Sequence, residues 1–355
     1  MKQSKHIPIL NTLRAVAALS VCFHHHLFTT QIYIHEYSPL KIFKFGNHGV
    51  TLFFVISGFV IPYSMYNKSF KLPNYGKFII KRLARLEPPY VVAIFLGIIF
   101  SYVRMLNPNG NGIDITPTFQ QVMLHFGYMI PLKDIFANFG YYPEILQSKG
   151  WIIGVFWSLA VEFQYYLYIG LFFPFIIHKK IMYRCIGYSI IFGTAIFTFL
   201  RFNTNFLPSW LPVFMVGIIL FLRHVKHIKD VEFYILLLIS LLSSYYCRGY
   251  EITIAAGVSF LLIALFTNFE NNFFHFFSLI SYSLYLTHTI VGDPFLNLVR
   301  HYVPDHLEEI IFFPLALGLS IGVAYILYLF VEKPSMNLSS RISWNKKKES
   351  KQKEE

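Results

Sequence analysis

The sequence predicts an all-α fold: a polytopic integral membrane bundle of about ten transmembrane helices with both termini in the cytoplasm. The chain of 355 residues is 55% hydrophobic and only 14% charged, whereas soluble domains carry about 25% charged residues. Its mean hydropathy of +0.51 is correspondingly high. Apolar stretches of about 20 residues, long enough to cross a hydrocarbon layer, recur throughout the chain. These observations exclude a water-soluble enzyme and leave no room for a large domain outside the membrane.

The individual spans follow from apolar stretches bounded by charged residues or by Pro, Asn and Gly. In chain order we expect them at 9–31, 48–66, 88–105, 152–177, 184–200, 210–224, 231–247, 252–267, 278–293 and 310–331. The first span is too long for a signal-peptide core and carries Arg14 and three histidines, so we expect it to be retained. No internal repeat of the kind found in many transporters is visible.

The basic residues orient this bundle. With a cytoplasmic N-terminus, most Lys and Arg fall on the inner side: at the start of the chain, in 68–85, 179–184 and 223–229, and in the tail. This uneven distribution of Lys and Arg between the two sides predicts a multi-pass protein of the cytoplasmic membrane. We expect a membrane domain at 1–334 and a basic cytoplasmic tail at 335–355. The bilayer therefore accounts for the formal net charge of +12, and no nucleic-acid partner is expected.

Two further features of the chain bear on its sites. The three cysteines, Cys22, Cys185 and Cys247, lack CxxC spacing and an even count, so neither a disulfide framework nor a metal site is expected. The longest connection, 106–151, is rich in Asn, Gly, Pro and aromatic residues and falls on the outer side. Its length is unusual for a structureless loop in a compact protein, and we expect a partly ordered cap.

Ionisable side chains within the spans are costly and therefore informative. The first span holds Arg14, His24, His25 and His26. At 100° per residue, His25 lies about 20° from the face of Arg14, whereas His24 and His26 lie about 80° and 120° away. Arg14 and His25, about 16 Å apart along the axis, would then line one stripe across the membrane. The alternative is that the histidines reach toward the outer surface or bond to backbone carbonyls.

Two later spans carry polar groups at helical spacing. Ser158 and Glu162 are four residues apart and share one face of the fourth span. Glu162 could pair with Arg14 or with an imidazole, or could only satisfy a buried cation. In the ninth span, Ser281, Tyr285 and His288 share a face, which places His288 at a depth similar to that of the first-span histidines.

The inner connection between the second and third spans offers a pair of guanidinium groups. Arg82 and Arg85 lie three residues apart just before the expected break at Pro88 and Pro89. Two guanidiniums at the inner surface suit a phosphate-bearing ligand, although attraction to anionic lipid headgroups explains the spacing equally well. In the second span, Ser57 precedes a glycine that would allow close backbone approach, which by itself is a weak signal.

Five segments together resemble the acyltransferase-3 family of polytopic membrane O-acyltransferases. In chain order they are LRAVAALSVCFHH, GVTLFFVISGF, RLARLEPPY, WSLAVEFQYYL and SYSLYLTH. The resemblance extends over the chain from about residue 7 to 334. The resemblance implies that 1–334 is a membrane acyltransferase domain that takes an acyl group, usually acetyl from cytoplasmic acetyl-CoA, to a hydroxyl of an extracytoplasmic glycan or polysaccharide of the cell envelope. By motif, it implies essential roles for Arg14 and His25, a donor role for Arg82 and Arg85, and a match of Ser158 and Glu162 to the Ser-Leu-x-x-Glu element.

The chain also departs from the family pattern. Asn11 and Thr12 stand where many members have Asp-Gly, and Thr51 stands where an acidic or amide residue often occurs. Both departures remove a potential partner of Arg14 or His25. No hydrolase-like domain follows the last span, so the spans complete the transfer themselves or pass the acyl group to a separate extracytoplasmic protein.

The expected chemistry needs a base near the attacking hydroxyl, and imidazole titrates close to neutrality. We assign this role to His25, with Arg14, Glu162 and Ser158 beside it. We expect acetyl-CoA on Arg82, Arg85 and Arg14, no metal, and a substrate path along His24, His288, Tyr285 and Ser57. Ser57 lacks a strand-turn-helix elbow, so direct transfer is favoured, and an acyl-histidine intermediate stays open. The competing functions are a proton-coupled transporter or flippase, and a membrane scaffold anchored to anionic lipid.

Overall fold

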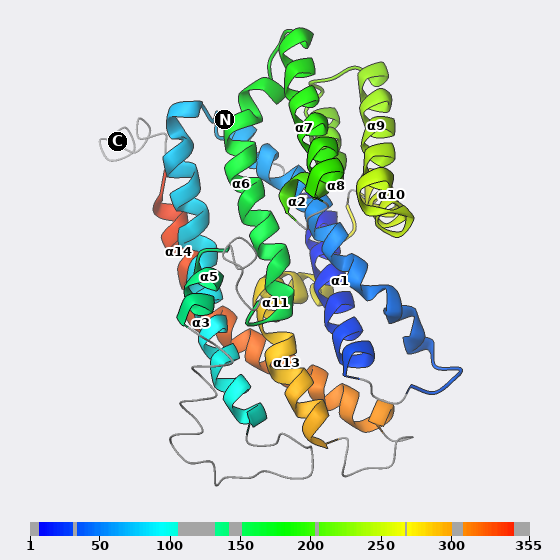
Figure 1. Ribbon diagram of the computed structural model, residues 1–355, viewed down its shortest axis with the longest axis vertical. Helices are drawn as coiled ribbons and strands as arrows, with labels where there is room; N and C mark the ends of the chain where they lie inside the picture. Colours follow the sequence, from blue (N-terminus) through cyan, green and yellow to red (C-terminus); the bar gives the residue numbers. More distant parts are fainter. Residues whose placement is uncertain are drawn as a thin grey trace.

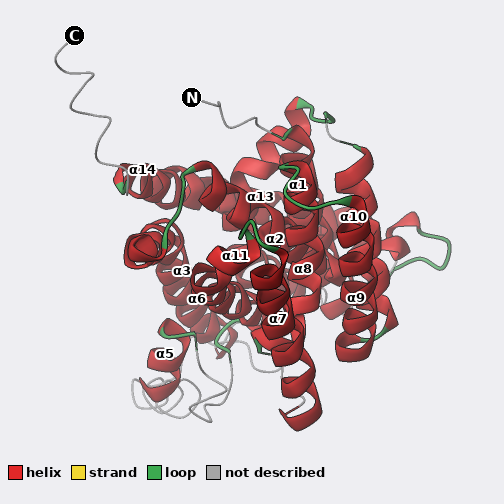
Figure 2. Cartoon of the chain, turned by 90° about the horizontal axis from the view of Figure 1, so that it is seen from above, coloured by secondary structure: helices red, strands yellow, loops and turns green. Residues whose placement is uncertain are grey.

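The computed structural model describes residues 7–30, 34–105, 132–141, 151–202, 206–266, 268–299 and 308–343. Within these ranges every regular element is a helix and no strand occurs (Figure 2). The α-helices are α1 Pro8–His24, α2 Gly49–Asn67, α3 Tyr75–Met105, α5 Leu132–Phe139, α6 Trp157–Ile176, α7 Ile181–Phe202, α8 Leu207–His224, α9 Asp230–Arg248, α10 Tyr250–Leu265, α11 Asn272–Val299, α13 Phe313–Leu327 and α14 Lys333–Arg341. Shorter 3-10 segments are η2 Pro39–His48, η3 Leu72–Asn74 and η4 Gly154–Phe156, and π-helical segments are η1 His25–Thr29, η6 Glu308–Phe312 and η7 Tyr328–Glu332.

Each of the ten expected spans coincides with a helix, and seven helices of the described chain are long and apolar enough to cross a membrane. They cover Pro39–Asn67, Leu72–Phe100, Gly154–Ile176, Ile181–Leu200, Leu207–His224, Asp230–Arg248 and Glu309–Arg341. Helix α10 is apolar but only 16 residues long. Helices α1 and α11, which carry the histidines, are not among the seven. The described part of the chain is therefore an all-helical bundle with seven candidate membrane-spanning helices, and the expected count of ten spans stays a prediction.

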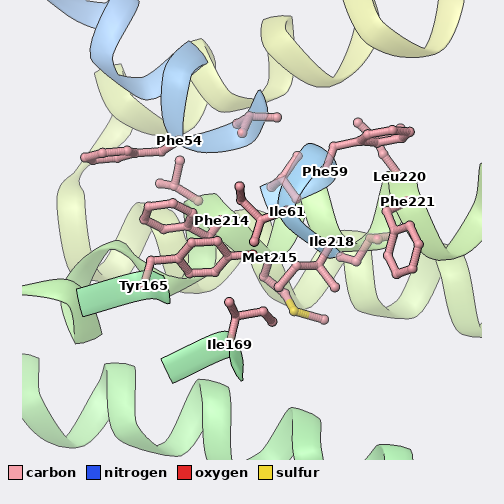
Figure 3. Close-up of a cluster of buried hydrophobic side chains, with 14 of the residues drawn as sticks. Phe54, Phe59, Ile61, Tyr165, Ile169, Phe214, Met215, Ile218, Leu220 and Phe221 are labelled. Carbon is pink, nitrogen blue, oxygen red and sulfur yellow. The ribbon is translucent and has the colours of Figure 1, made fainter. Parts of the chain in front are cut away.

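Helix α8 forms the centre of one half of the bundle, between α2, α7 and α9 (Figures 1 and 2). Its aromatic and aliphatic side chains interlock with those of α2 and α6, as in the stack of Phe214 on Tyr165, whose ring centroids are 4.1 Å apart (Figure 3). The helices α2 and α8 touch backbone to backbone, because a Cβ atom at Gly217 would lie 2.0 Å from the carbonyl oxygen of Val55. Small residues at such contacts are what allow membrane helices to approach closely.

Helix α1 lies against α2 and α11, and α11 also packs on α13. The contact surface of α1 is built from small, buried side chains, Ala15, Ala18 and Cys22, which meet Leu284 of α11 and Ala324 of α13. Because these side chains are small, the polar residues on either side of them on α1 and α11 come within reach of one another. The packing of α1 on α11 thus determines the geometry of the site described below.

The expected break at Pro88 and Pro89 is wrong, because α3 continues through both prolines from Tyr75 to Met105. Proline removes a helical N–H donor, but membrane helices tolerate it where neighbouring groups compensate. The missing donors of Pro88 and Pro89 would have bonded to the carbonyls of Ala84 and Arg85, and the hydroxyl of Tyr282 donates in the same turn, to the carbonyl of Leu86, at 2.9 Å. Arg82 and Arg85 therefore lie within a long helix and not in a connection.

The C-terminal helices run without interruption past the expected domain boundary at residue 334. The segment from η6 to α14 is helical over 308–341, with a π-helical turn at each end of α13. Helix α14 packs on α3, where Lys81 Nζ donates to the carbonyls of Ser339 and Ile342 at 2.7 and 2.8 Å. The described part of the predicted tail is thus attached to the bundle, and residues 344–355 lie outside the described residues.

Most of the expected cap at 106–151 lies outside the described residues. Residues 132–141 are described, and they pack against α3 and α6. The Tyr141 ring stacks between Tyr90 and Phe163, with centroid distances of 4.7 and 5.1 Å. Tyr90 also donates a hydrogen bond to the carbonyl of Asn138 at 2.8 Å. This part of the connection is therefore anchored to the membrane helices by aromatic stacking.

Three connections lie at one end of the bundle: α2 to α3, α6 to α7, and α8 to α9, all toward the top of Figure 1. They contain the lysines Lys68, Lys71, Lys179, Lys180, Lys226 and Lys229. We call this end the basic end. Its assignment to the cytoplasm follows the positive-inside rule and stays a prediction.

Candidate active site

A cavity opens between α1, α2, α3, α6, α11 and η7. The space inside it that water can occupy is about 110 Å³, which is below the range of about 300–1,000 Å³ found for small-molecule sites. Its polar and charged lining residues are Arg14, Ser57, Arg82, Arg85, Ser158, Glu162, Tyr166, Ser281, Tyr282, Tyr285 and Glu332, and apolar side chains of α2, α3 and α6 complete the wall. Helices far apart in the sequence thus gather their polar groups around one space.

Three guanidinium groups line this cavity. Arg82 lies over the rings of Phe78 and Tyr166, with its Cζ atom 5.3 and 5.5 Å from the centroids, and its buried Nε has no hydrogen-bond partner among the described residues. No described carboxylate lies within ion-pair distance of Arg14, Arg82 or Arg85. Buried cations are normally paired or neutralised, so this arrangement favours an anionic ligand.

The two carboxylates of the cavity are hydrogen-bonded to neutral groups. Glu162 Oε1 accepts from the hydroxyls of Ser57 at 2.8 Å and Tyr166 at 2.5 Å. Glu332 Oε2 accepts from the hydroxyl and the backbone N–H of Ser283, at 2.6 and 3.2 Å. Neither carboxylate forms an ion pair within the described chain. Three guanidiniums against two carboxylates leave the cavity with an excess of positive charge.

The positive charge extends toward the basic end. Lys68 lies in the connection between α2 and α3, outside the spans. Burial lowers the pKa of its ammonium group, and the nearby charges of Arg82 and Arg85 lower it further. Lys68 is therefore close enough to Arg82 and Arg85 for the three positive charges to repel one another. An anion that enters the cavity from the basic end meets a positive potential.

The wall of the cavity nearest the histidines is formed by Ser158 and Tyr285. Their hydroxyl oxygens are 2.6 Å apart, and the carbonyl of Val155 lies 3.1 Å from the former and 3.0 Å from the latter. No histidine or carboxylate of the described chain hydrogen-bonds to Ser158. A serine without an adjacent base is a weak nucleophile, so the geometry gives Ser158 a structural role in the wall.

Beyond Tyr285, three histidines form what we call the imidazole cluster: His25, His26 and His288. The His288 ring centroid is 5.1 Å from that of His25, 6.2 Å from that of His26 and 5.9 Å from that of Tyr285. His288 Nδ1 donates to the carbonyls of Leu284 and Tyr285 at 3.0 and 2.9 Å. Its buried Nε2 has no partner among the described residues, and with Nδ1 protonated this nitrogen carries the free lone pair.

The structure separates the three adjacent histidines of the first span. Helix α1 ends at His24, and His25 begins the π-helical η1, so the regular 100° step no longer applies there. His24 turns toward η2, where its Nδ1 lies 3.2 Å from the carbonyl of Phe43. His26, expected to lie away from the Arg14 face, is fully buried and reaches the cluster. Single π-helical turns of this kind are frequent at functional sites.

The expected site residues thus fall into three groups. The cavity is lined by Arg14, Ser57, Arg82, Arg85, Ser158, Glu162 and Tyr285. His25 and His288 lie beyond its wall, and His24 lies next to His25, with their ring centroids 5.6 Å apart. Sequence reasoning did not single out Glu332, His26 or Asp293. Glu332 is the first ionisable residue after the last expected span, and Asp293 is the last residue of the ninth expected span. Their position at the edge of a span was the feature of the sequence that could have identified them as candidate site residues.

No group of three or more His, Cys, Asp and Glu side chains is arranged to hold a metal ion within the described residues. The residues of the cavity instead fit a phosphate-bearing organic ligand, because guanidinium groups bind phosphate oxygens by charge-assisted hydrogen bonds. The expected acyl-CoA donor carries such phosphates, and the chemistry of the lining agrees with it.

Comparison with known proteins identifies the family. A family model described as an acyltransferase domain matches residues 7–329. The chain is similar to nodulation protein 10 of Rhizobium leguminosarum bv. viciae, with 28% identity over 173 residues; the alignment covers 46% of this chain and 43% of that protein. No solved structure matches. The chain, with its polar cavity enclosed by membrane helices, belongs to the acyltransferase-3 family.

Proposed function

We propose that the protein transfers an acetyl or other short acyl group from acyl-CoA to a hydroxyl of a glycan or polysaccharide of the cell envelope. The observation that carries the proposal is the cavity with three unpaired guanidiniums, which ends at Tyr285, next to the imidazole cluster. The family supports acyl transfer, the guanidiniums support an anionic donor, and the imidazoles support deprotonation of a hydroxyl.

The donor would lie along the cavity. Arg82 and Arg85 would hold the phosphates of CoA near the basic end, and the pantetheine arm would extend past Arg14. The thioester would then lie beside Tyr285, within reach of the imidazole cluster. The guanidinium group of Arg14, which forms no ion pair within the described chain, suits the negative charge that develops on the carbonyl oxygen of the thioester.

In the proposed reaction, His25 takes the proton of the acceptor hydroxyl while the hydroxyl oxygen attacks the thioester carbon. The tetrahedral intermediate collapses, the carbon–sulfur bond breaks and the CoA thiolate leaves. The imidazolium returns its proton to the thiolate, which restores the enzyme. Direct transfer is favoured over a relay through Ser158 because Ser158 has no adjacent base in the described structure.

The test uses the full chain in lipid nanodiscs with radiolabelled acetyl-CoA and a panel of envelope polysaccharides. We expect release of free CoA thiol that depends on acceptor, together with an equal amount of label in the glycan as a base-labile ester. The matched control is the double variant Arg82→Gln, Arg85→Gln, in which the rate should fall. Movement of acceptor across sealed vesicles without release of CoA would refute the proposal and favour a transporter or flippase.

A further inference from the structure

The side chain of His26 is held by hydrogen bonds at both ring nitrogens. Its Nδ1 lies 3.3 Å from Asp293 Oδ1, and its Nε2 lies 3.0 Å from Ser320 Oγ and 3.5 Å from Cys22 Sγ. Because a carboxylate only accepts, the Nδ1–H of His26 donates to Asp293. The two residues come from η1 and α11, and their contact joins the π-helical turn to the helix that carries His288.

The backbone of α11 is shaped to receive this imidazole. A Cβ atom at Gly292 would lie 2.0 Å from Cε1 and 2.4 Å from Nε2 of His26. The ring therefore lies directly on the backbone at Gly292, one residue before the carboxylate that it contacts. Ring and carboxylate are consequently held in one arrangement, with His26 fully buried and Asp293 only 14% exposed.

Asp293 supplies negative charge to the imidazole cluster. Besides its contact with His26, it interacts electrostatically with His25. His26 in turn lies 6.2 Å from His288, whose ring is 5.1 Å from His25. Asp293 is the one described carboxylate that interacts with both His25 and His26. A proton that enters the cluster adds a positive charge in a medium of low dielectric constant, where a fixed negative charge nearby is most effective.

We propose that Asp293 is a positioning residue of acyl transfer that acts through His26; the inference rests on the function proposed above. When the imidazole base takes the proton from the acceptor hydroxyl, the carboxylate of Asp293 compensates the positive charge of the cluster. Asp293 forms no bond with the substrate and keeps no proton, which passes from the hydroxyl to the imidazole and then to the CoA thiolate.

A second interpretation of the same contacts is a Ser-His-Asp triad with Ser320 as nucleophile. Ser320 is fully buried and is not among the residues that line the cavity. A thioester held in the cavity would therefore not reach its hydroxyl without a rearrangement of α13. The geometry favours the positioning role, and the triad becomes one outcome of the test.

The test compares Asp293→Asn, Asp293→Glu and Ser320→Ala with the unaltered full chain in nanodiscs. We expect Asp293→Asn to lower kcat at least about tenfold, part of the factor of about 10²–10⁴ that a positioned base contributes, while the KM for acyl-CoA stays within about twofold. Asp293→Glu should recover most of the rate, and Ser320→Ala should lose less than Asp293→Asn. A loss in Ser320→Ala as complete as that in Asp293→Asn would instead support the triad.

A second measurement does not depend on transfer. Diethyl pyrocarbonate acylates imidazoles that have a free nitrogen, and mass spectrometry locates the product. His26 should be protected in the unaltered protein and in Asp293→Glu, and should become reactive in Asp293→Asn. An unchanged pattern, or an unchanged kcat, in Asp293→Asn would overturn the positioning role. Absence of transfer in the unaltered protein, with the expected pattern of modification, would overturn the proposed function alone.

Discussion

The imidazole rings of His25 and His288 lie 5.1 Å apart, although one begins the π-helical turn after α1 and the other lies within α11. The ring of His288 is oriented by two backbone carbonyls, so its free Nε2 has a defined direction. A base and a neighbouring proton acceptor are thus held in place by the packing of two helices.

The first prediction concerns the base. His25→Ala should abolish acyl transfer without changing the amount of protein in the membrane, because the cluster loses the imidazole assigned to deprotonation. His24→Ala is the matched control, since the His24 ring, 5.6 Å from that of His25, directs its Nδ1 toward the Phe43 carbonyl, and it should cost much less. Rates of transfer by membranes with equal protein content decide the matter, and equal losses in both variants would contradict the assignment of His25.

The second prediction concerns the donor. Replacing Arg82 and Arg85 by Gln should weaken acyl-CoA binding about tenfold or more, because a hydrogen bond to a charged group contributes about 1.5–3 kcal/mol. Lys at both positions should restore binding only in part, because the bidentate fork is lost. Lys179→Gln with Lys180→Gln changes the same charge at the same end, outside the cavity, and serves as control. Unchanged donor affinity in the Gln variant would leave lipid anchoring as the explanation.

The third prediction concerns Glu332. Glu332→Gln removes one negative charge from a cavity lined by three guanidiniums and weakens the bonds from Ser283. We expect the free energy of unfolding to fall by about 1–3 kcal/mol, while binding of the anionic donor is unchanged or tighter because the potential becomes more positive. Thermal unfolding in detergent and equilibrium binding of acyl-CoA measure the two effects. Weaker donor binding in a folded variant would contradict this view of the cavity.

The fourth prediction concerns the contact of α2 with α8. Gly217→Ala should lower the free energy of unfolding by about 1–3 kcal/mol, the usual cost of overpacking, because the new Cβ would lie 2.0 Å from the Val55 carbonyl oxygen. Gly318→Ala is the matched control in α13, where no described atom lies within 4 Å of the added Cβ. Thermal unfolding of both variants in the same detergent tests the difference, and equal midpoints would show that the two helices can separate at little cost.

The fifth prediction concerns sidedness. In sealed vesicles of known orientation, acyl-CoA should support transfer only from the face with the basic connections, and the acceptor should be modified only on the opposite face. The reason is that Arg82 and Arg85 lie toward the basic end, whereas the imidazole cluster lies beyond Tyr285. Modification of acceptor on the same face as the donor would refute access from the outer side.

Hydrophobic length predicts the helices well in this chain, because a bilayer-length apolar stretch has few alternatives to a helix. The prolines at 88 and 89 mislead, because α3 continues through both of them and a single sequence does not show how neighbouring helices accommodate them. The π-helical η1 also escapes prediction. Extrapolation at 100° per residue puts His26 off the Arg14 face, but it does not show that His26 packs on Gly292 of α11 and reaches the imidazole cluster.

The carboxylates show a similar limit. The family pattern places an acidic residue near Arg14 or the first-span histidine, and this chain has Asn11 and Thr51 at the corresponding positions. Glu332 and Asp293 supply negative charge from η7 and α11 instead. Charge compensation in a buried site requires a carboxylate at the right place in space, not at a particular place in the sequence, so a single sequence cannot reveal it.

Helix α11 has one further consequence. It is continuous from Asn272 to Val299, and it carries Tyr282 and Tyr285 in the cavity wall as well as His288 and Asp293 in and beside the cluster. Tyr285 and His288 are separated by an axial rise of about 4.5 Å. Because both residues lie on one continuous helix, a sliding movement of α11 would displace the cavity wall at Tyr285 and the imidazole of His288 by the same amount and in the same direction. Such a movement would leave the distance from Tyr285 to His288 unchanged, and it would alter the distance of both from His25, because His25 lies on η1.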